Sequence, residues 1–220
     1  MCLELVKPRI LFDKPIYIGF SCLDLSKLFM YKFHYNVLLP EYPNANLCFT
    51  DTDSFLYEIK TQDIYKDLHK LKEYFDFSNY PPEHPLYSTE NKTKIGLMKD
   101  ECGSKSISEF VGLRSKMYSL TTVDGVQKAR AAGVKKHVKN KILKHNLYKR
   151  AVFGIPFKYT LNNIEYNHPD FAVIQNSFRT YNHQVKTISQ RRTGVSAYDD
   201  KRWVDDCGLT TKAHGHYKNR

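Results

Sequence analysis

The chain has 220 residues, of which 41% are hydrophobic and 26% are charged. This composition suits one globular domain or two small ones, and it excludes a disordered or collagen-like chain. No apolar run reaches the roughly 18 residues of a membrane-spanning helix, and charges interrupt the N-terminal segment where a secretory signal would be apolar. The five cysteines are widely spaced without a C-x-x-C pair, which favours an intracellular, reducing compartment such as the nucleus or an organelle.

The positive charge is concentrated in the second half. Residues 1–110 hold 13 Lys and Arg against 16 Asp and Glu, whereas residues 111–220 hold 21 against 7. Residues 128–150 contain nine basic residues and no acidic one. Because like charges repel, this segment favours a polyanionic partner, and a nucleic-acid backbone is the commonest. A merely soluble basic surface is the alternative. An anionic membrane surface is a weaker one, since few large aromatic residues are available to insert.

The first half predicts a helix, a hairpin and a second helix. A mainly apolar stretch over 16–39 carries residues at helical spacing and is ended by Pro40 and Pro43. Residues 47–57 have apolar flanks around a polar centre, which indicates strand, tight turn, strand. Thr61 is then expected to cap a second helix that turns Ile64, Leu68 and Leu71 inward.

The second half predicts strands followed by a basic helix. Runs of β type cover 94–98 and 110–122, and the sequence Val-Asp-Gly at 123–125 indicates a turn that closes the second run. Apolar residues at helical spacing then predict a basic amphipathic helix through Val134, Val138 and Ile142. The tail from Gly194 is polar.

A pair of carboxylates lies at the centre of the predicted hairpin. On an extended segment the side chains of Asp51 and Asp53 would lie on one face and aim at one point. Two close carboxylates repel, and a divalent cation removes that cost. Mg²⁺ commonly uses one or two carboxylates together with substrate phosphates, which is the chemistry of phosphoryl and nucleotidyl transfer. An Asp-rich hairpin turn without a metal is the structural alternative.

Two segments together resemble a known family. The sequence Phe-Thr-Asp-Thr-Asp-Ser at 49–54, between apolar strands, resembles motif C of family B DNA polymerases. The sequence Leu-Arg-Ser-Lys-Met-Tyr at 113–118 resembles the downstream Lys-x-Tyr motif of the same family. Residues 14–20 and 25–31 are similar to the segment and helix that lead into motif C.

Other segments are similar to the protein-primed branch of that family. They are residues 110–114, the Gly-Val-Lys-Lys sequence at 133–136, and two pieces of the tail at 199–202 and 213–216. Within the branch, the resemblance is to polymerases of Polinton/Maverick-type transposons and related viral or organellar elements. It spans roughly residues 14–218.

The resemblance implies roles for particular residues. Asp53 would be a principal metal ligand and Asp51 the supporting carboxylate, with Mg²⁺ as the metal or Mn²⁺ in its place. Lys116 and Tyr118 would hold the primer strand near its 3′ end. The residues expected to contact duplex phosphates are Lys128, Arg130, Lys135, Lys136 and Lys139. The implied partners are primer–template DNA, deoxynucleotide triphosphates and a terminal protein that provides the first primer hydroxyl; no membrane partner is expected.

The sequence also departs from the family pattern. Phe49 and Ala132 stand where the family usually has Tyr and Lys, and motifs A and B and the exonuclease domain have no counterpart in these residues. We therefore expect an α+β fold: part of a polymerase palm over 1–122, with antiparallel strands bearing motif C packed on helices, then a basic thumb-like region and tail over 123–220. We expect this chain alone not to extend primers.

Two other functions fit parts of the pattern. A non-catalytic DNA-binding remnant of a transposon polymerase would keep only the basic half. A metal-dependent nuclease would need three or four converging acids, and only two stand at motif spacing, so it ranks last.

Overall fold

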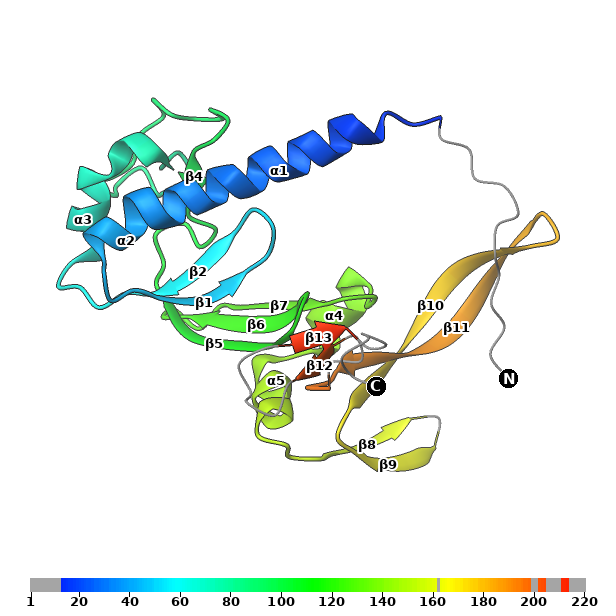
Figure 1. Cartoon of the computed structure of the whole chain (residues 1–220). Coiled ribbons are helices and arrows are strands. Elements are labelled where there is room, and N and C mark those ends of the chain that lie inside the picture. The colour runs from blue at the N-terminus through cyan, green and yellow to red at the C-terminus, as the bar shows by residue number, and fades with distance from the viewer. Residues whose placement is uncertain (1–12, 162, 199–201, 205–210, 214–220) are drawn as a thin grey trace. The chain divides into compact units, whose positions relative to one another are not determined.

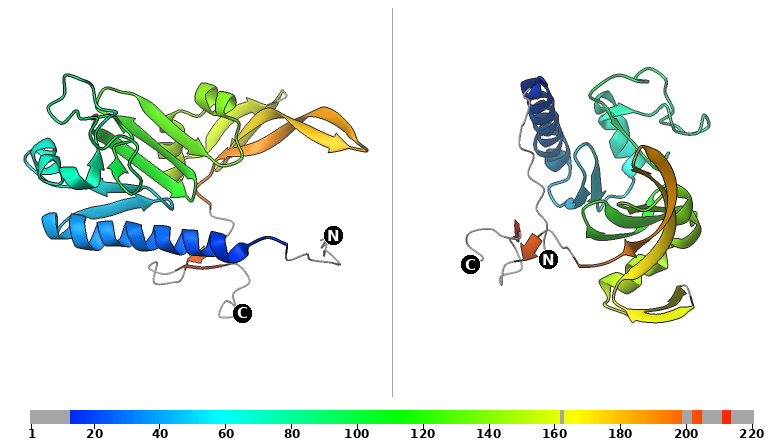
Figure 2. Two further views of the ribbon diagram at one scale, coloured as in Figure 1. Left: turned by 90° about the horizontal axis from the view of Figure 1, so that it is seen from above. Right: turned by 90° about the vertical axis from the view of Figure 1, so that its right-hand side faces the viewer.

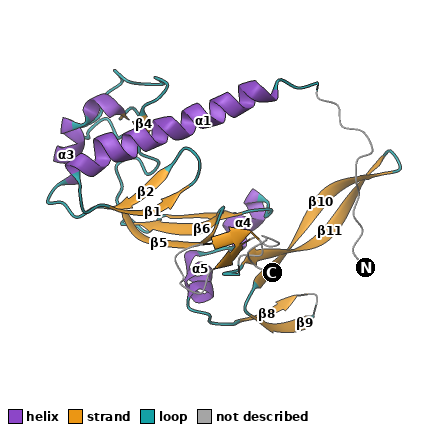
Figure 3. Ribbon diagram, viewed as in Figure 1, coloured by secondary structure: helices purple, strands orange, loops and turns teal. Residues whose placement is uncertain are grey.

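The computed structural model describes residues 13–161, 163–198, 202–204 and 211–213. Helices and mostly antiparallel strands are mixed along the chain, so the predicted α+β class is confirmed (Figure 3). The chain forms two compact units, Met1–Tyr74 and Phe75–Arg220. The assignment of a palm to 1–122 and a thumb to 123–220 stays a prediction. Within the part of the chain described, no helix is long and apolar enough to cross a bilayer.

The first unit opens with a long helix, as predicted. Helix α1 (Ile16–Lys32) continues into a π-helix, η1 (Phe33–Leu38), and a short α2 (Leu39–Glu41). Pro40 lies in the first turn of α2, where a missing N–H is tolerated, and Tyr42 ends the helix. The buried residues are few and lie toward the C-terminal end: Met30, Phe33 and Leu38. The other large apolar side chains of α1 are exposed.

The predicted strand–turn–strand is also confirmed. Strand β1 (Asn46–Thr50) pairs antiparallel with β2 (Phe55–Glu58). Aromatic rings of η1 pack on this hairpin: the His34 and Tyr57 rings are stacked with centroids 5.7 Å apart, and His34 Nδ1 lies 2.8 Å from the Tyr57 hydroxyl oxygen. Burial raises the pKa of Tyr57 to about 12. The contact therefore fixes the hairpin against the π-helix.

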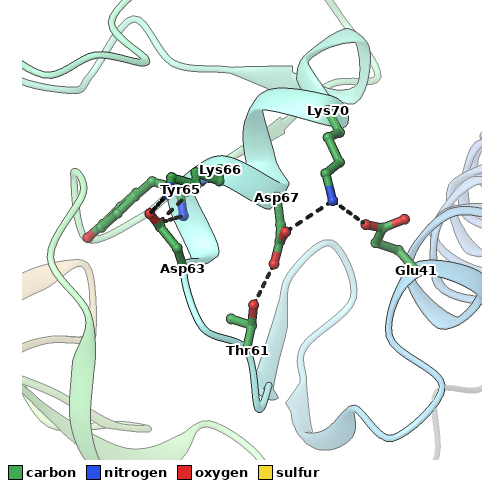
Figure 4. A network of polar contacts seen from close by, with 7 residues as sticks. All are labelled: Glu41, Thr61, Asp63, Tyr65, Lys66, Asp67 and Lys70. Carbon is green, nitrogen blue, oxygen red and sulfur yellow. Dashed lines mark hydrogen bonds and ion pairs between the residues drawn. The ribbon is translucent and has the colours of Figure 1, made fainter.

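Helix α3 (Ile64–Lys70) forms as expected, but the prediction that Thr61 caps it is wrong. Asp63 is the cap, because it directly precedes the first helical residue and its carboxylate accepts hydrogen bonds from the next free backbone N–H groups, those of Tyr65 and Lys66. The Thr61 hydroxyl instead donates to the Asp67 carboxylate at 2.5 Å (Figure 4). A single turn of 3₁₀ helix, η2 (Lys72–Tyr74), ends the unit.

The second unit is built around a three-stranded antiparallel sheet. Two short parallel strands, β3 (Phe75–Asp76) and β4 (Met98–Lys99), precede it. The sheet consists of β5 (Ile107–Arg114), β6 (Met117–Thr122) and β7 (Gln127–Ala131), with β6 in the middle.

The turns of this sheet were predicted in part. The turn at 123–125 forms, with the Gly125 N–H donating to the Thr122 carbonyl oxygen at 2.9 Å. The predicted β-type run over 110–122 forms two strands, because Ser115 and Lys116 form a tight turn that separates β5 from β6. Lys116 has a φ of 56°, a left-handed backbone conformation that few non-glycine residues adopt.

The predicted basic helix forms over Val138 and Ile142, but Val134 lies before its first residue, and a second helix follows it. Helix α4 (Lys136–Ile142) and helix α5 (His145–Val152) are separated because Leu143 and Lys144 have extended backbone conformations. Both helices cover the sheet, and Val138, Leu143 and Tyr148 enter the core. The remaining fully buried side chains of this core include Met117, Phe157, Val173 and Val195.

The strands after α5 were not predicted. They form one hairpin from β8 (Phe157–Leu161) and β9 (Ile164–His168) and a longer one from β10 (Phe171–Tyr181) and β11 (Gln184–Val195). The long hairpin reaches away from α4 and the three-stranded sheet (Figures 1 and 2). A third pair, β12 (Arg202–Val204) and β13 (Thr211–Ala213), follows. Residues 199–201 and 214–216 of the family-like tail lie outside the described residues.

Candidate functional site

Asp51 and Asp53 lie in the turn of the β1–β2 hairpin. The Asp53 N–H donates to the Asp51 carbonyl oxygen at 2.7 Å, and the Asp51 N–H donates to the Ser54 carbonyl oxygen at 3.2 Å. Thr52, between the two acids, has a φ of 60°, which a β-branched residue adopts only at a cost in free energy. The hydrogen bond and the positive φ define a tight three-residue turn with one acid at each end.

Asp51 and Asp53 do not lie on an extended segment, so the reason for which we predicted that their side chains converge is wrong. We expected an extended segment, in which alternate side chains share a face. Both acids lie beyond the last residue of β1, so this alternation does not apply to them. The backbone hydrogen bond from Asp53 to Asp51 brings the residues together instead. Their role as metal ligands stays a prediction.

The negative charges of Asp51 and Asp53 would favour binding of a cation at this turn. Asp53 is exposed and Asp51 is half-buried. Within the described ranges neither carboxylate forms an ion pair with a basic side chain, and the Thr52 hydroxyl lies 3.4 Å from Asp51 Oδ1. Oxygen donors without a counter-charge are the ligands that Mg²⁺ prefers. No group of three or more His, Cys, Asp or Glu side chains suited to a metal occurs in the described part, so further oxygen ligands would have to come from elsewhere.

In the second unit the Lys-x-Tyr segment lies beside the Gly-Val-Lys-Lys segment. Lys116 is exposed in its turn, and its carbonyl oxygen accepts a hydrogen bond of 3.1 Å from the Ala132 N–H. Tyr118 is half-buried on β6, where it pairs with Arg130 on β7. Sheet pairing thus brings together two segments that the sequence separates.

Three of the predicted DNA-binding residues influence one another electrostatically. Burial lowers the pKa of the Lys139 ammonium, and the positive charges of Arg130 and Lys136 lower it further. These charges come from β7 and from α4, so they meet only in the folded unit. Arg130, Lys136 and Lys139 are called the cationic cluster below. Such a cluster favours an anionic ligand, because the ligand relieves the mutual repulsion.

Lys128 is held differently from the cationic cluster. It shares a face of β7 with Arg130, since the two are separated by one residue. Its ammonium, however, donates to the Glu101 carbonyl oxygen at 2.5 Å and lies 4.0 Å from Cys102 Sγ. A phosphate contact by Lys128 would therefore compete with an existing hydrogen bond.

A polar network around the buried side chains of His145 and Ser119 was not predicted from the sequence. His145 is 4% exposed; its Nδ1 lies 3.0 Å from Ser119 Oγ and its Nε2 lies 3.1 Å from a Glu109 carboxylate oxygen. Lys149 donates to the other Glu109 oxygen at 2.8 Å, and this bond, with the positive charge of Lys149, lowers the pKa of Glu109. Ser119 is fully buried, so the network is not a nucleophilic triad; it joins α5 to the sheet.

No protein-family model matches the chain, and no curated protein and no solved structure matches it.

Proposed function

We propose that the chain is the palm and thumb part of a protein-primed family B DNA polymerase. The complete reaction is template-directed nucleotidyl transfer, in which a primer 3′-hydroxyl attacks the α-phosphate of a deoxynucleotide triphosphate and pyrophosphate leaves. The first primer hydroxyl would belong to a terminal protein. The observation that carries the proposal is that the Lys-x-Tyr segment lies beside the basic segment: Tyr118 pairs with Arg130, and the Lys116 carbonyl oxygen accepts from the N–H of Ala132, next to the Gly-Val-Lys-Lys sequence. The two segments were assigned to DNA from separate features of the sequence.

In the proposed reaction, the acids and the basic residues have separate roles. Asp51 and Asp53 would hold Mg²⁺ or Mn²⁺, which when bound supplies positive charge to the reacting phosphate. Lys116 neutralises a primer phosphate, and the Tyr118 hydroxyl donates a hydrogen bond near the primer terminus. The cationic cluster, with Lys135, binds phosphates of the duplex without reading its sequence.

A non-catalytic DNA-binding protein is the second candidate function. The specific observation in its favour concerns the turn that carries Asp51 and Asp53, called the acidic turn. Among the residues described, no third His, Cys, Asp or Glu side chain joins these two in a group that could hold a metal. Catalysis of phosphoryl transfer depends on complete electrostatic positioning. This function would keep the cationic cluster and make the acidic turn dispensable.

Titration of the full chain with a fluorescent primer–template tests the proposal. We expect binding whose logarithmic dependence on salt concentration has a slope of about −4.5, because the proposal assigns five basic residues to phosphates and each contributes about −0.9. Primer extension by this chain alone with Mg²⁺ should give no product, since motifs A and B of the family have no counterpart in its 220 residues. A chain that fails to bind primer–template, or that binds without salt dependence, would refute the proposal, and robust extension would refute the assignment of inactivity.

A further inference from the structure

The buried amide of Gln175 joins the long β10–β11 hairpin to the segment that precedes α4. Gln175 is 6% exposed. Its Nε2 donates to the Gly133 carbonyl oxygen at 2.9 Å, and its Oε1 accepts from the Lys135 backbone N–H at 2.8 Å. Both ends of the amide are therefore used, and they hold the backbone on either side of Val134.

The segment that Gln175 holds has an irregular backbone. Gly133 has a φ of 82°, which glycine adopts without strain, and Lys135 is extended before the first helical residue, Lys136. Without the Gln175 amide, the Gly133 carbonyl and the Lys135 N–H would lose these hydrogen bonds. The Gln175 amide therefore restricts the backbone conformations from which the side chains of Lys135 and Lys136 extend.

The same hairpin also contacts the side chain of Lys135. The Lys135 ammonium lies 5.5 Å from the ring centroid of Phe178, which is on β10 as well. A cation over an aromatic face is attracted by the ring, so this contact restricts the ammonium. Gln175 and Phe178 together hold both the backbone and the charged end of Lys135.

We propose that Gln175 is a positioning residue that fixes Lys135 and Lys136 for contact with a nucleic-acid phosphate. The inference rests on the proposed DNA-binding function and extends it to the hairpin, where no sequence motif was recognised. Gln175 itself is too buried to touch DNA. It acts by lowering the conformational entropy that the two lysines lose on binding.

The test compares Gln175→Met with Gln190→Met in duplex DNA binding. Methionine has nearly the shape of glutamine and removes both hydrogen bonds, while Gln190 lies directly opposite on β11 and provides the matched control. We expect Gln175→Met to weaken binding about tenfold and to reduce the magnitude of the salt slope by about 1–2, because one or two phosphate contacts are weakened. Gln190→Met should bind within about twofold of wild type.

A double-mutant cycle separates positioning from a general loss of structure. In a Lys135→Gln/Lys136→Gln background, Gln175→Met should leave the affinity unchanged, because the lysines through which it acts are gone. An equal loss in both backgrounds, or no loss in wild type, overturns the inference. If Gln175→Met does not fold, Gln175→Glu, which keeps the acceptor for the Lys135 N–H, is tested in the same cycle. Failure of the wild-type chain to bind DNA would overturn the proposed function as well.

Discussion

Replacing Arg130, Lys136 and Lys139 together by glutamine is expected to weaken duplex DNA binding about a thousandfold near physiological salt. Each of the three side chains should contribute about tenfold, because a hydrogen bond between charged groups is worth about 1.5 kcal/mol or more. The magnitude of the salt slope should fall by about 2.7, since each neutralised phosphate contributes about 0.9. Part of the effect arises because the three charges meet in the folded unit and repel one another without a ligand. Fluorescence anisotropy at several salt concentrations measures both quantities.

A control variant has the same net charge as this triple variant but loses its three positive charges from the first unit. Lys27, Lys32 and Lys60 are exposed residues of the first unit, and replacing them by glutamine removes the same three charges. We expect this variant to lose less than about fivefold in affinity, because these exposed charges are not assigned to phosphate contacts and salt screens exposed charges. Equal losses in the two triple variants would mean that net charge alone governs binding, and the cationic cluster would then have no special role.

Tyr148→Ala is expected to destabilise the chain by about 3–5 kcal/mol, the cost of removing a large aromatic ring from a packed core. Tyr148 is fully buried in α5, and its hydroxyl donates to the Arg130 carbonyl oxygen at 2.9 Å. Tyr148→Phe is the matched control. It loses only this hydrogen bond and should cost about 1–2 kcal/mol. Urea unfolding followed by circular dichroism measures both changes.

This residue also links the core to the proposed DNA-binding surface. The Tyr148 hydroxyl donates to the backbone carbonyl of Arg130 on β7. A cavity at Tyr148 should therefore make the positions of the cationic cluster less well defined. A loss below about 1 kcal/mol in Tyr148→Ala would contradict the packing described for α5.

Local features could be predicted from the sequence because their signals are local. The β1–β2 hairpin follows from two apolar runs that flank five polar residues, and the end of the first helical region follows from Pro40 and Pro43. The cap of α3 was misassigned because Thr61 and Asp63 both favour capping; Asp63 is the cap because it directly precedes Ile64.

The remaining features depend on tertiary contacts or on turns without a sequence signal. Lys116 and the pair Asn182–His183 adopt positive φ values although none of them is a glycine, so the two hairpins that they close carry no recognisable turn motif. The hydrogen-bond partners of Gln175 lie 40 and 42 residues away in the chain. The side chain of His145 contacts Ser119 and Glu109, which lie 26 and 36 residues away. Such pairs come together only through tertiary packing.

Mn²⁺ binding to the full chain, followed by water-proton relaxation, is the most direct measurement of whether Asp51 and Asp53 share a divalent cation. We predict that Asp51→Asn/Asp53→Asn abolishes a Mn²⁺ site that wild type has. Asp24→Asn/Glu73→Gln, which changes two exposed acids of the same unit, should retain it. Indistinguishable Mn²⁺ binding by wild type and Asp51→Asn/Asp53→Asn would contradict the metal-binding role of the acidic turn.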